Sequence, residues 1–115
     1  MDIYDIASNS WSTGTNGTAR ASMGSGIVWK GKIYYFHGIS GASTVNTVAI
    51  YDIATNSWST GTSGGTARST HSVVFYNDKA YLWAGYTVTP AVVNTLDIYD
   101  FPTNTWSTGT AGGTA

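Results

Sequence analysis

Short runs rich in β-branched and aromatic residues alternate along the chain with clusters of Gly, Ser, Thr, Asn and Asp. Such runs lie at 24–29, 32–37 and 47–53, and again at 70–76, 79–84 and 95–101. Apolar runs of four to eight residues bounded by turn formers predict β-strands. The runs at 24–29 and 70–76 are apolar throughout, so we expect these two strands to be covered on both faces.

One segment of the chain occurs three times. Residues 3–15, 50–62 and 98–110 are near-identical, and their tryptophans, Trp11, Trp58 and Trp106, are 47 and 48 residues apart. Each period predicts four strands, with a tight hairpin turn between the first two at Lys30–Gly31 or Asn77–Asp78. Four antiparallel strands in a period of about 47 residues are typical of one blade of a β-propeller.

The repeat resembles the kelch family. That family opens its innermost strand with an Arg and often a His, here Arg68 and His71. It also places a Trp seven residues after the Tyr of a Tyr-Asp pair, as in Tyr51 and Trp58. The family's usual double glycine is replaced, because His37-Gly38 stands there in one repeat and Ala84-Gly85 in the other. The resemblance implies an all-β fold of kelch-type β-propeller blades, each with four antiparallel strands, which is incomplete as a single chain.

The repeat divides the chain into an outer half-blade at 1–19, with the third and fourth strands only, and full blades at 20–67 and 68–115. Known propellers close with about four to eight blades. We therefore expect an exposed apolar sheet face and association with copies of the chain or with further kelch blades. Two explanations stay open: the chain is a piece of a longer kelch array, or it assembles by letting one half-blade displace another.

Composition and charge exclude several classes of function. Gly, Ser, Thr and Asn make up close to half of the 115 residues, and neither Glu nor Cys occurs. A formal net charge of −1 with five Lys and Arg argues against a nucleic-acid partner. No apolar run approaches the roughly 20 residues that cross a bilayer, so no membrane partner is expected. We expect no signal peptide, because Met1 leads directly into a predicted strand, although the composition resembles that of secreted bacterial β proteins and favours an extracellular or cell-surface location.

Several repeated side chains are candidates for catalysis or ligand binding. The repeated aspartates Asp5, Asp52 and Asp100 each begin a turn, where we expect them to bond backbone N–H groups rather than to act as acids. The repeated tryptophans are expected to pack between neighbouring sheets rather than to stack on sugars. Arg20 and Arg68 open the innermost strands, and they would either bind an anion or carboxylate or bond carbonyls of the neighbouring loops.

One face of the predicted blades carries further candidates. Antiparallel strand order places His37 and His71 on the same face of neighbouring blades, but no third metal ligand is obvious, so neither a metal nor another cofactor is expected. The longer loops at 39–45 and 86–93 lie at this face with Trp83 and Tyr86 nearby. This surface is therefore the expected place for a ligand.

The sequence predicts a non-catalytic kelch-type module with a structural, self-assembling or ligand-displaying role. The alternative is a fragment of a larger secreted kelch protein that binds carbohydrate or resembles the enzymes galactose oxidase or sialate mutarotase. Galactose oxidase-like chemistry needs a Tyr, His and Cys copper site, and mutarotase-like chemistry needs Arg, Glu and His. The absence of Cys and Glu argues against both enzymes.

Overall fold

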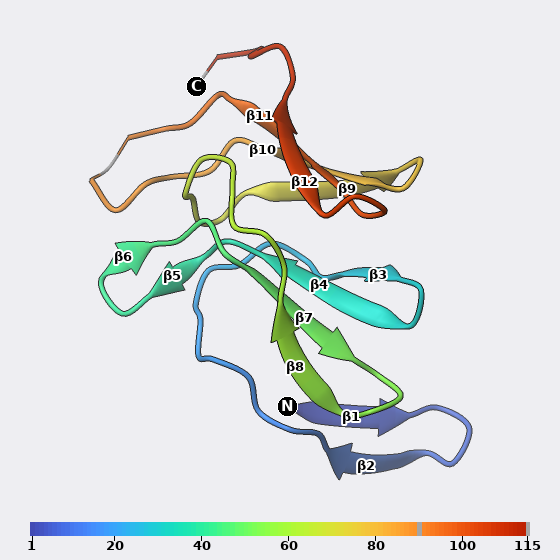
Figure 1. Ribbon diagram of the computed structural model, residues 1–115. Coiled ribbons are helices and arrows are strands. Elements are labelled where there is room, and N and C mark those ends of the chain that lie inside the picture. Colours follow the sequence, from blue (N-terminus) through green and yellow to red (C-terminus); the bar gives the residue numbers. More distant parts are fainter. Residues whose placement is uncertain (90, 115) are drawn as a thin grey trace.

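The computed structural model describes residues 1–89 and 91–114, and this part of the chain consists of strands, turns and loops (Figure 1). Position 90, in the 86–93 loop, and position 115, the end of the second predicted full blade, lie outside the described residues.

The N-terminal hairpin consists of β1 (Asp2–Asp5) and β2 (Ser10–Thr13). The first four-stranded sheet contains β3 (Ile27–Trp29), β4 (Lys32–Phe36), β7 (Val48–Asp52) and β8 (Ser57–Thr60), and a small hairpin, β5 (Ile39–Ser40) and β6 (Ser43–Thr44), extends from it. The second four-stranded sheet contains β9 (Ser72–Tyr76), β10 (Lys79–Trp83), β11 (Leu96–Asp100) and β12 (Thr105–Thr108).

Both four-stranded sheets are antiparallel meanders, which confirms the predicted fold class. The turn between β9 and β10 has positive φ at both central residues, 48° at Asn77 and 58° at Asp78. The turn between β3 and β4 does the same, with 46° at Lys30 and 74° at Gly31. Two-residue turns of this type suit the right-handed twist of the strands that they join, so the local sequence closes both hairpins where it predicts them.

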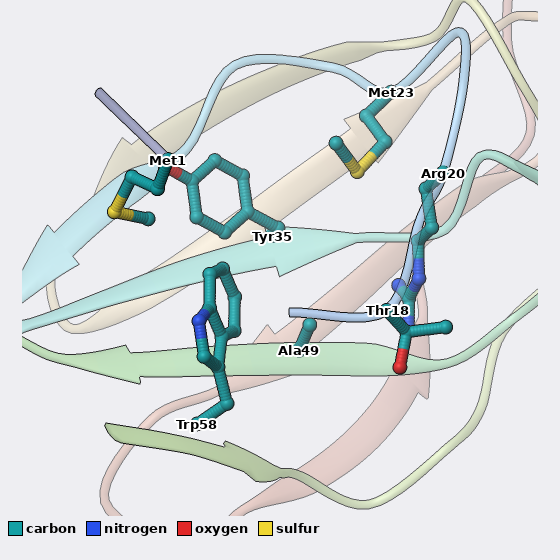
Figure 2. Close-up of a pocket in the computed structure, with 7 residues that line it drawn as sticks. All are labelled: Met1, Thr18, Arg20, Met23, Tyr35, Ala49 and Trp58. Carbon is teal, nitrogen blue, oxygen red and sulfur yellow. The ribbon is translucent and has the colours of Figure 1, made fainter. Parts of the chain in front are cut away.

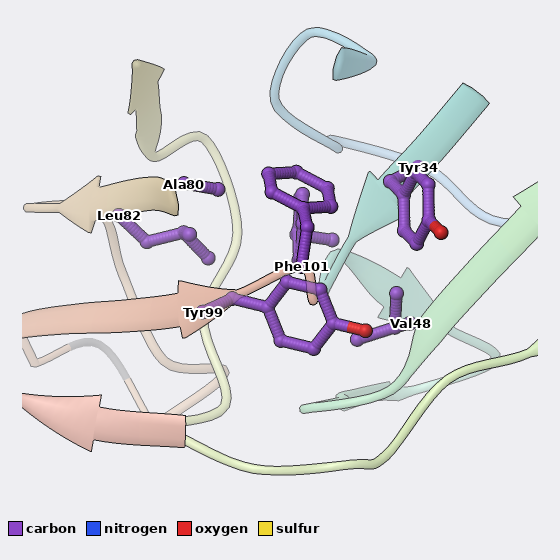
Figure 3. Close-up of a cluster of buried hydrophobic side chains, with 7 residues drawn as sticks. Tyr34, Val48, Ala80, Leu82, Tyr99 and Phe101 are labelled. Atoms are coloured by element: carbon purple, nitrogen blue, oxygen red, sulfur yellow. The ribbon is translucent and has the colours of Figure 1, made fainter. Parts of the chain in front are cut away.

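The core lies between the two four-stranded sheets (Figure 3). Alternation along the strands turns Tyr34, Phe36 and Val48 of the first sheet toward Ala80, Leu82, Tyr99 and Phe101 of the second. The rings meet mostly edge to face. The ring centroids of Phe101 and Tyr34, for example, are 4.8 Å apart, and their planes lie at 86° to each other. Edge-to-face contact adds to the burial of apolar area, so aromatic packing is a main source of cohesion between the sheets.

The N-terminal hairpin lies on the opposite face of the first sheet (Figure 1). A Cβ built on Gly14 would lie 3.0 Å from the Tyr51 hydroxyl, and one on Gly61 would lie 3.2 Å from the Tyr99 hydroxyl. The strands β1 and β2 therefore pack on the first sheet as β7 and β8 pack on the second. Beside the second sheet lie all four strands of the first. Beside the first sheet lie only β1 and β2, because no strands equivalent to β3 and β4 accompany them within the described residues.

Two expectations about burial were wrong. The strands at 24–29 and 70–76 are not covered on both faces, since Val28, Val74 and Tyr76 are 62%, 57% and 70% exposed. Trp11 does not pack between sheets: it is 71% exposed and its ring contacts that of Tyr4. The physical reason is the same for both, because a blade face is buried only where another sheet lies against it. No helix in the described part of the chain is long and apolar enough to span a membrane.

Candidate functional site

Arg68 lies fully buried at the start of the second sheet and is bonded on every side. It donates to the carbonyl oxygens of Ala84 and Thr95, at 3.1 and 3.0 Å, and forms a buried ion pair with Asp97. Asp97 also accepts the Thr66 amide at 2.7 Å. Burial lowers the pKa of the Arg68 guanidinium, and the Asp97 carboxylate opposes that shift. The N–H groups of Arg68 thus donate to groups of the chain itself rather than to a ligand.

Arg20 takes the matching position in the first sheet with fewer partners. Its Nη1 donates to the carbonyl oxygens of Thr47 and His37, at 3.2 and 3.4 Å, which repeats the backbone anchoring of Arg68. The residue in the place of Asp97 is Ala49, which pairs with β4 and β8 in the same register. Burial lowers the pKa of the Arg20 guanidinium, and no acidic side chain within the described residues forms a salt bridge with it.

A pocket of about 210 Å³ opens at Arg20 (Figure 2). The side chains that line it come from the N-terminal segment and from β4, β7 and β8; they are Met1, Thr18, Arg20, Met23, Tyr35, Ala49 and Trp58. Tyr35 and Trp58 form a wall, with ring centroids 5.9 Å apart at 33° between planes. The pocket thus combines a guanidinium with an aromatic wall at the face of the first sheet that points away from the second.

His37 and His71 meet between the sheets, with ring centroids 5.6 Å apart. His37 stacks on Trp106 and its Nε2 donates to the Gly64 carbonyl oxygen at 3.0 Å. Both nitrogens of His71 are buried without a hydrogen-bond partner in the described part of the chain. Burial lowers the pKa of each imidazole to about 4, helped by the neighbouring His71 for His37 and by Arg68 for His71. Both rings are therefore neutral at pH 7, and no three His, Asp, Glu or Cys side chains converge among the described residues.

The two predicted aromatic ligand residues are exposed, unlike the buried histidine pair. Trp83 is 41% exposed in β10, where it pairs with Ser72 and Leu96 on one face of the second sheet. Tyr86 is 52% exposed in the loop after β10, and its backbone bonds that of Ser69. A role for either residue in ligand binding stays a prediction.

The chain keeps an unusual backbone where the double glycine of the family would lie. His37 and Ala84 have positive φ, 58° and 62°, and each precedes a glycine with φ near 100°. A Cβ on Gly85 would lie 2.4 Å from the Ser69 carbonyl oxygen, so the close approach of the segment before β9 excludes a side chain there. The second glycine is therefore required, whereas the first position tolerates other residues at a cost in strain.

The repeated aspartates lie in turns. Asp5, Asp52 and Asp100 accept the backbone amides of Ser8, Thr55 and Thr103, at 2.8, 3.0 and 3.1 Å. The amide and hydroxyl of Ser8 lower the pKa of Asp5, and those of Thr55 lower the pKa of Asp52. The Thr103 hydroxyl, the Lys79 ammonium and the Thr103 amide lower the pKa of Asp100. Each Asp is thus bonded to its own turn, and Asp52 and Asp100 also pair with Lys32 and Lys79 of the adjacent strand, at 3.6 and 3.1 Å.

The face of the second sheet that points away from the first is apolar, and no strand among the described residues covers it, although residues Gly109 and Gly113 of the segment after β12 lie against Leu96 and Trp83. We call it the outer face; its apolar members are Val74, Tyr76, Tyr81, Trp83, Leu96 and Ile98. The strand pairing aligns each with a residue of the first sheet, in the same order Ile27, Trp29, Tyr34, Phe36, Val48 and Ile50. In the first sheet this set faces the second sheet, whereas in the second sheet it faces no strand of the described chain.

A comparison with protein families matches residues 67–113 to the kelch motif. The matched span includes Arg68, His71, the whole second sheet and the loop after β12. No curated protein matches the chain.

Proposed function

We propose, on the premise that this chain belongs to the kelch-repeat family, that it is a non-catalytic assembly module whose outer face docks a further blade. Kelch repeats generally mediate protein–protein interactions. The occupant that we assign to the outer face is the first sheet of a second copy of this chain. The observation that carries the proposal is the aligned set of apolar residues on the two sheets.

The outer face has the chemistry of a surface that is already an interface elsewhere in the chain. Trp83 stands where Phe36 stands, and Phe36 is buried against the rings of Tyr99 and Trp106. Tyr81 likewise stands where Tyr34 contacts Phe101. Val74, Tyr76 and Trp83 are exposed on this face, and covering them would remove apolar area from water, which favours association.

The receiving surface is the face of the first sheet on which the N-terminal hairpin lies. There Ile33, Tyr35, Tyr51 and Ile53 stand in the places of Ala80, Leu82, Tyr99 and Phe101, which the first sheet contacts within the chain. Val28, the counterpart of Phe75, is 62% exposed on this surface. Docking therefore repeats the internal sheet–sheet contact between chains. The incoming β11 and β12 would take the place that β1 and β2 occupy, so the hairpin must be displaced.

This contact joins two different surfaces, so its geometry is head to tail. We expect the wild-type chain to sediment as species larger than one chain, in proportions that rise with concentration. Val74→Lys places a charge on the outer face, and Val28→Lys places one on the receiving face. Both residues are already exposed in the single chain, so both variants should fold as monomers.

Mixing the two variants gives the decisive result. Each retains one intact surface, so a head-to-tail contact predicts a one-to-one dimer in the mixture, measured by light scattering after size exclusion. The matched control is Ile6→Lys, because Ile6 is 86% exposed in the turn of the N-terminal hairpin and belongs to neither surface. A wild-type chain that stays a folded monomer at all concentrations would overturn the proposal, as would a mixture that stays monomeric.

The titratable groups with structural partners support a non-catalytic role, because burial or hydrogen bonds within the chain engage them. The two imidazoles are buried between the sheets, and Asp97 is paired with Arg68. The three repeated carboxylates, Asp5, Asp52 and Asp100, accept amides of their own turns. Turnover of a sugar by the assembled protein, or a redox signal on addition of copper, would contradict this part of the proposal.

A further inference from the structure

We infer that the pocket at Arg20 binds a carboxylate group, in the place where the second sheet holds the side chain of Asp97. The inference does not depend on association between chains. It rests on a comparison that the molecule itself supplies, because the same site is built twice and only one copy contains its acid.

The two copies share their framework. Arg68 and Arg20 each use Nη1 to bond two carbonyl oxygens, Ala84 and Thr95 in one case and His37 and Thr47 in the other. In the second sheet Asp97 then accepts from Arg68 Nη2 and from the Thr66 amide. The counterpart of Thr66 is Thr18, which lines the pocket.

The first copy retains the donors and lacks the acceptor. Nη2 of Arg20 makes no hydrogen bond within the described residues, whereas Nη2 of Arg68 donates to Asp97 and to Thr95 Oγ1, and Nε of Arg68 donates to the Thr66 carbonyl oxygen. Ala49 ends at Cβ, so the space that the Asp97 carboxylate fills in the second copy is left open beside Arg20. A half-buried guanidinium without a counter-ion favours an anion, and its planar fork suits the two oxygens of a carboxylate.

A loop difference keeps this copy accessible. The segment 61–68 contains Gly65, whose built Cβ would lie 2.9 Å from Asp97 Oδ2, so its backbone covers the acid. The corresponding segment 14–20 is one residue shorter and has no counterpart of Gly65. The pocket therefore opens to solvent in the first sheet, whereas the Arg68–Asp97 pair is sealed.

The walls define the rest of the ligand. Tyr35 and Trp58 border the pocket with their rings, and Met23 adds an apolar side chain. A pocket of about 210 Å³ accommodates a compact molecule. The ligand class is thus a small monocarboxylate with a flat apolar body, whose carboxylate bonds Arg20 and the Thr18 amide while its body packs on the aromatic wall.

Phenylacetate is the probe, and phenylacetamide, which has the same body without the charge, is its control. We expect phenylacetate to shift the Arg20 Nε–H and the Trp58 indole N–H signals in nitrogen-15 NMR spectra in a saturable way. Phenylacetamide and an equal concentration of sodium chloride should leave both signals in place. Saturable binding of phenylacetamide with the same affinity would overturn the inference, because the aromatic wall alone would then account for it.

The matched variant is Ala49→Asp, which installs the acid of the second copy in the first. We expect it to fold and to weaken phenylacetate binding at least about tenfold, since the ligand loses charge-assisted hydrogen bonds. Unchanged affinity in Ala49→Asp would refute the site. The reverse variant, Asp97→Ala, should gain a response of the Arg68 Nε–H signal, and if it does not fold, Ala49→Asp still decides the question.

Association is separated by repeating the titration on Val74→Lys. The outer face is remote from Arg20 in the same chain, so this variant should bind phenylacetate as the wild type does. Binding that persists in a monomeric Val74→Lys chain supports the pocket independently of docking. Binding that is lost in Val74→Lys would overturn the pocket as a property of the single chain.

Discussion

Acidification should destabilise the fold through the two buried histidines. The pKa of His37 and of His71 falls from 6.5 to about 4 in the folded chain, chiefly because burial disfavours the charged ring. Between these values the unfolded chain binds more protons than the folded one. The stabilising contribution is therefore complete above about pH 6.5, declines as the pH falls toward 4, and changes little below that.

The loss of stability depends on the difference between the unfolded and folded pKa values of each histidine. At pH 5 each histidine should reduce the free energy of unfolding by about 2 kcal/mol relative to pH 7. The rings are 5.6 Å apart and their titrations are coupled, so about 4 kcal/mol is the upper bound for the pair. Asp5, Asp52 and Asp100 have pKa values lowered from 3.8, so their contribution is lost only at more acidic pH.

The measurement is urea unfolding at pH 7 and at pH 5, followed by tryptophan fluorescence, on the wild type and on His71→Phe. Phenylalanine replaces the imidazole with an apolar ring and so removes two buried nitrogens that have no partner among the described residues. We expect the variant to lose about 2 kcal/mol less on acidification, since one of the two titrating groups is gone. Equal pH dependence in both proteins, or a wild-type stability that is flat between these pH values, would refute the reasoning.

Two further predictions concern stability. Ala84→Gly should raise the free energy of unfolding by up to about 1 kcal/mol in thermal or urea unfolding, because Ala84 has φ of 62°. Its control, Ala80→Gly, should destabilise, because Ala80 lies buried in a strand; a loss for both would contradict the strain argument. Leu82→Ala should cost about 2–5 kcal/mol, since Leu82 is fully buried between the sheets. The exposed Val74→Ala should cost much less, and similar losses for the two would place the core elsewhere.

Local sequence predicted the elements well because their causes are local. The pairs Lys30–Gly31 and Asn77–Asp78 close hairpins through their own tolerance of positive φ. Asp52 and Asp100 bond amides three residues further along the chain. The match of residues 67–113 to the kelch motif supports, for that part of the chain, the resemblance that the Arg, Tyr-Asp and Trp spacing indicated.

The candidate site was predicted less completely. The sequence singled out Arg20 and Arg68 as equivalents and left open whether they bind an anion or backbone carbonyls. Both bond carbonyls in the structure, and they differ through Asp97, which stands 29 residues after Arg68 in the chain. Aligning the two repeats at Ala49 and Asp97 would have revealed the difference. The strand pairing was needed to show which arginine the acid meets.

The repeat, the strands, the turns and the kelch resemblance can be read from the sequence alone, because each depends on residues that are neighbours along the chain. Which copies of the repeat are buried depends on the tertiary structure. Trp11 and Trp106 lie in near-identical segments, yet Trp11 is 71% exposed whereas Trp106 packs on Phe36 and His37 of the first sheet. The physical reason is that burial belongs to a pair of surfaces, so identical repeats differ wherever only one of them has a neighbouring sheet.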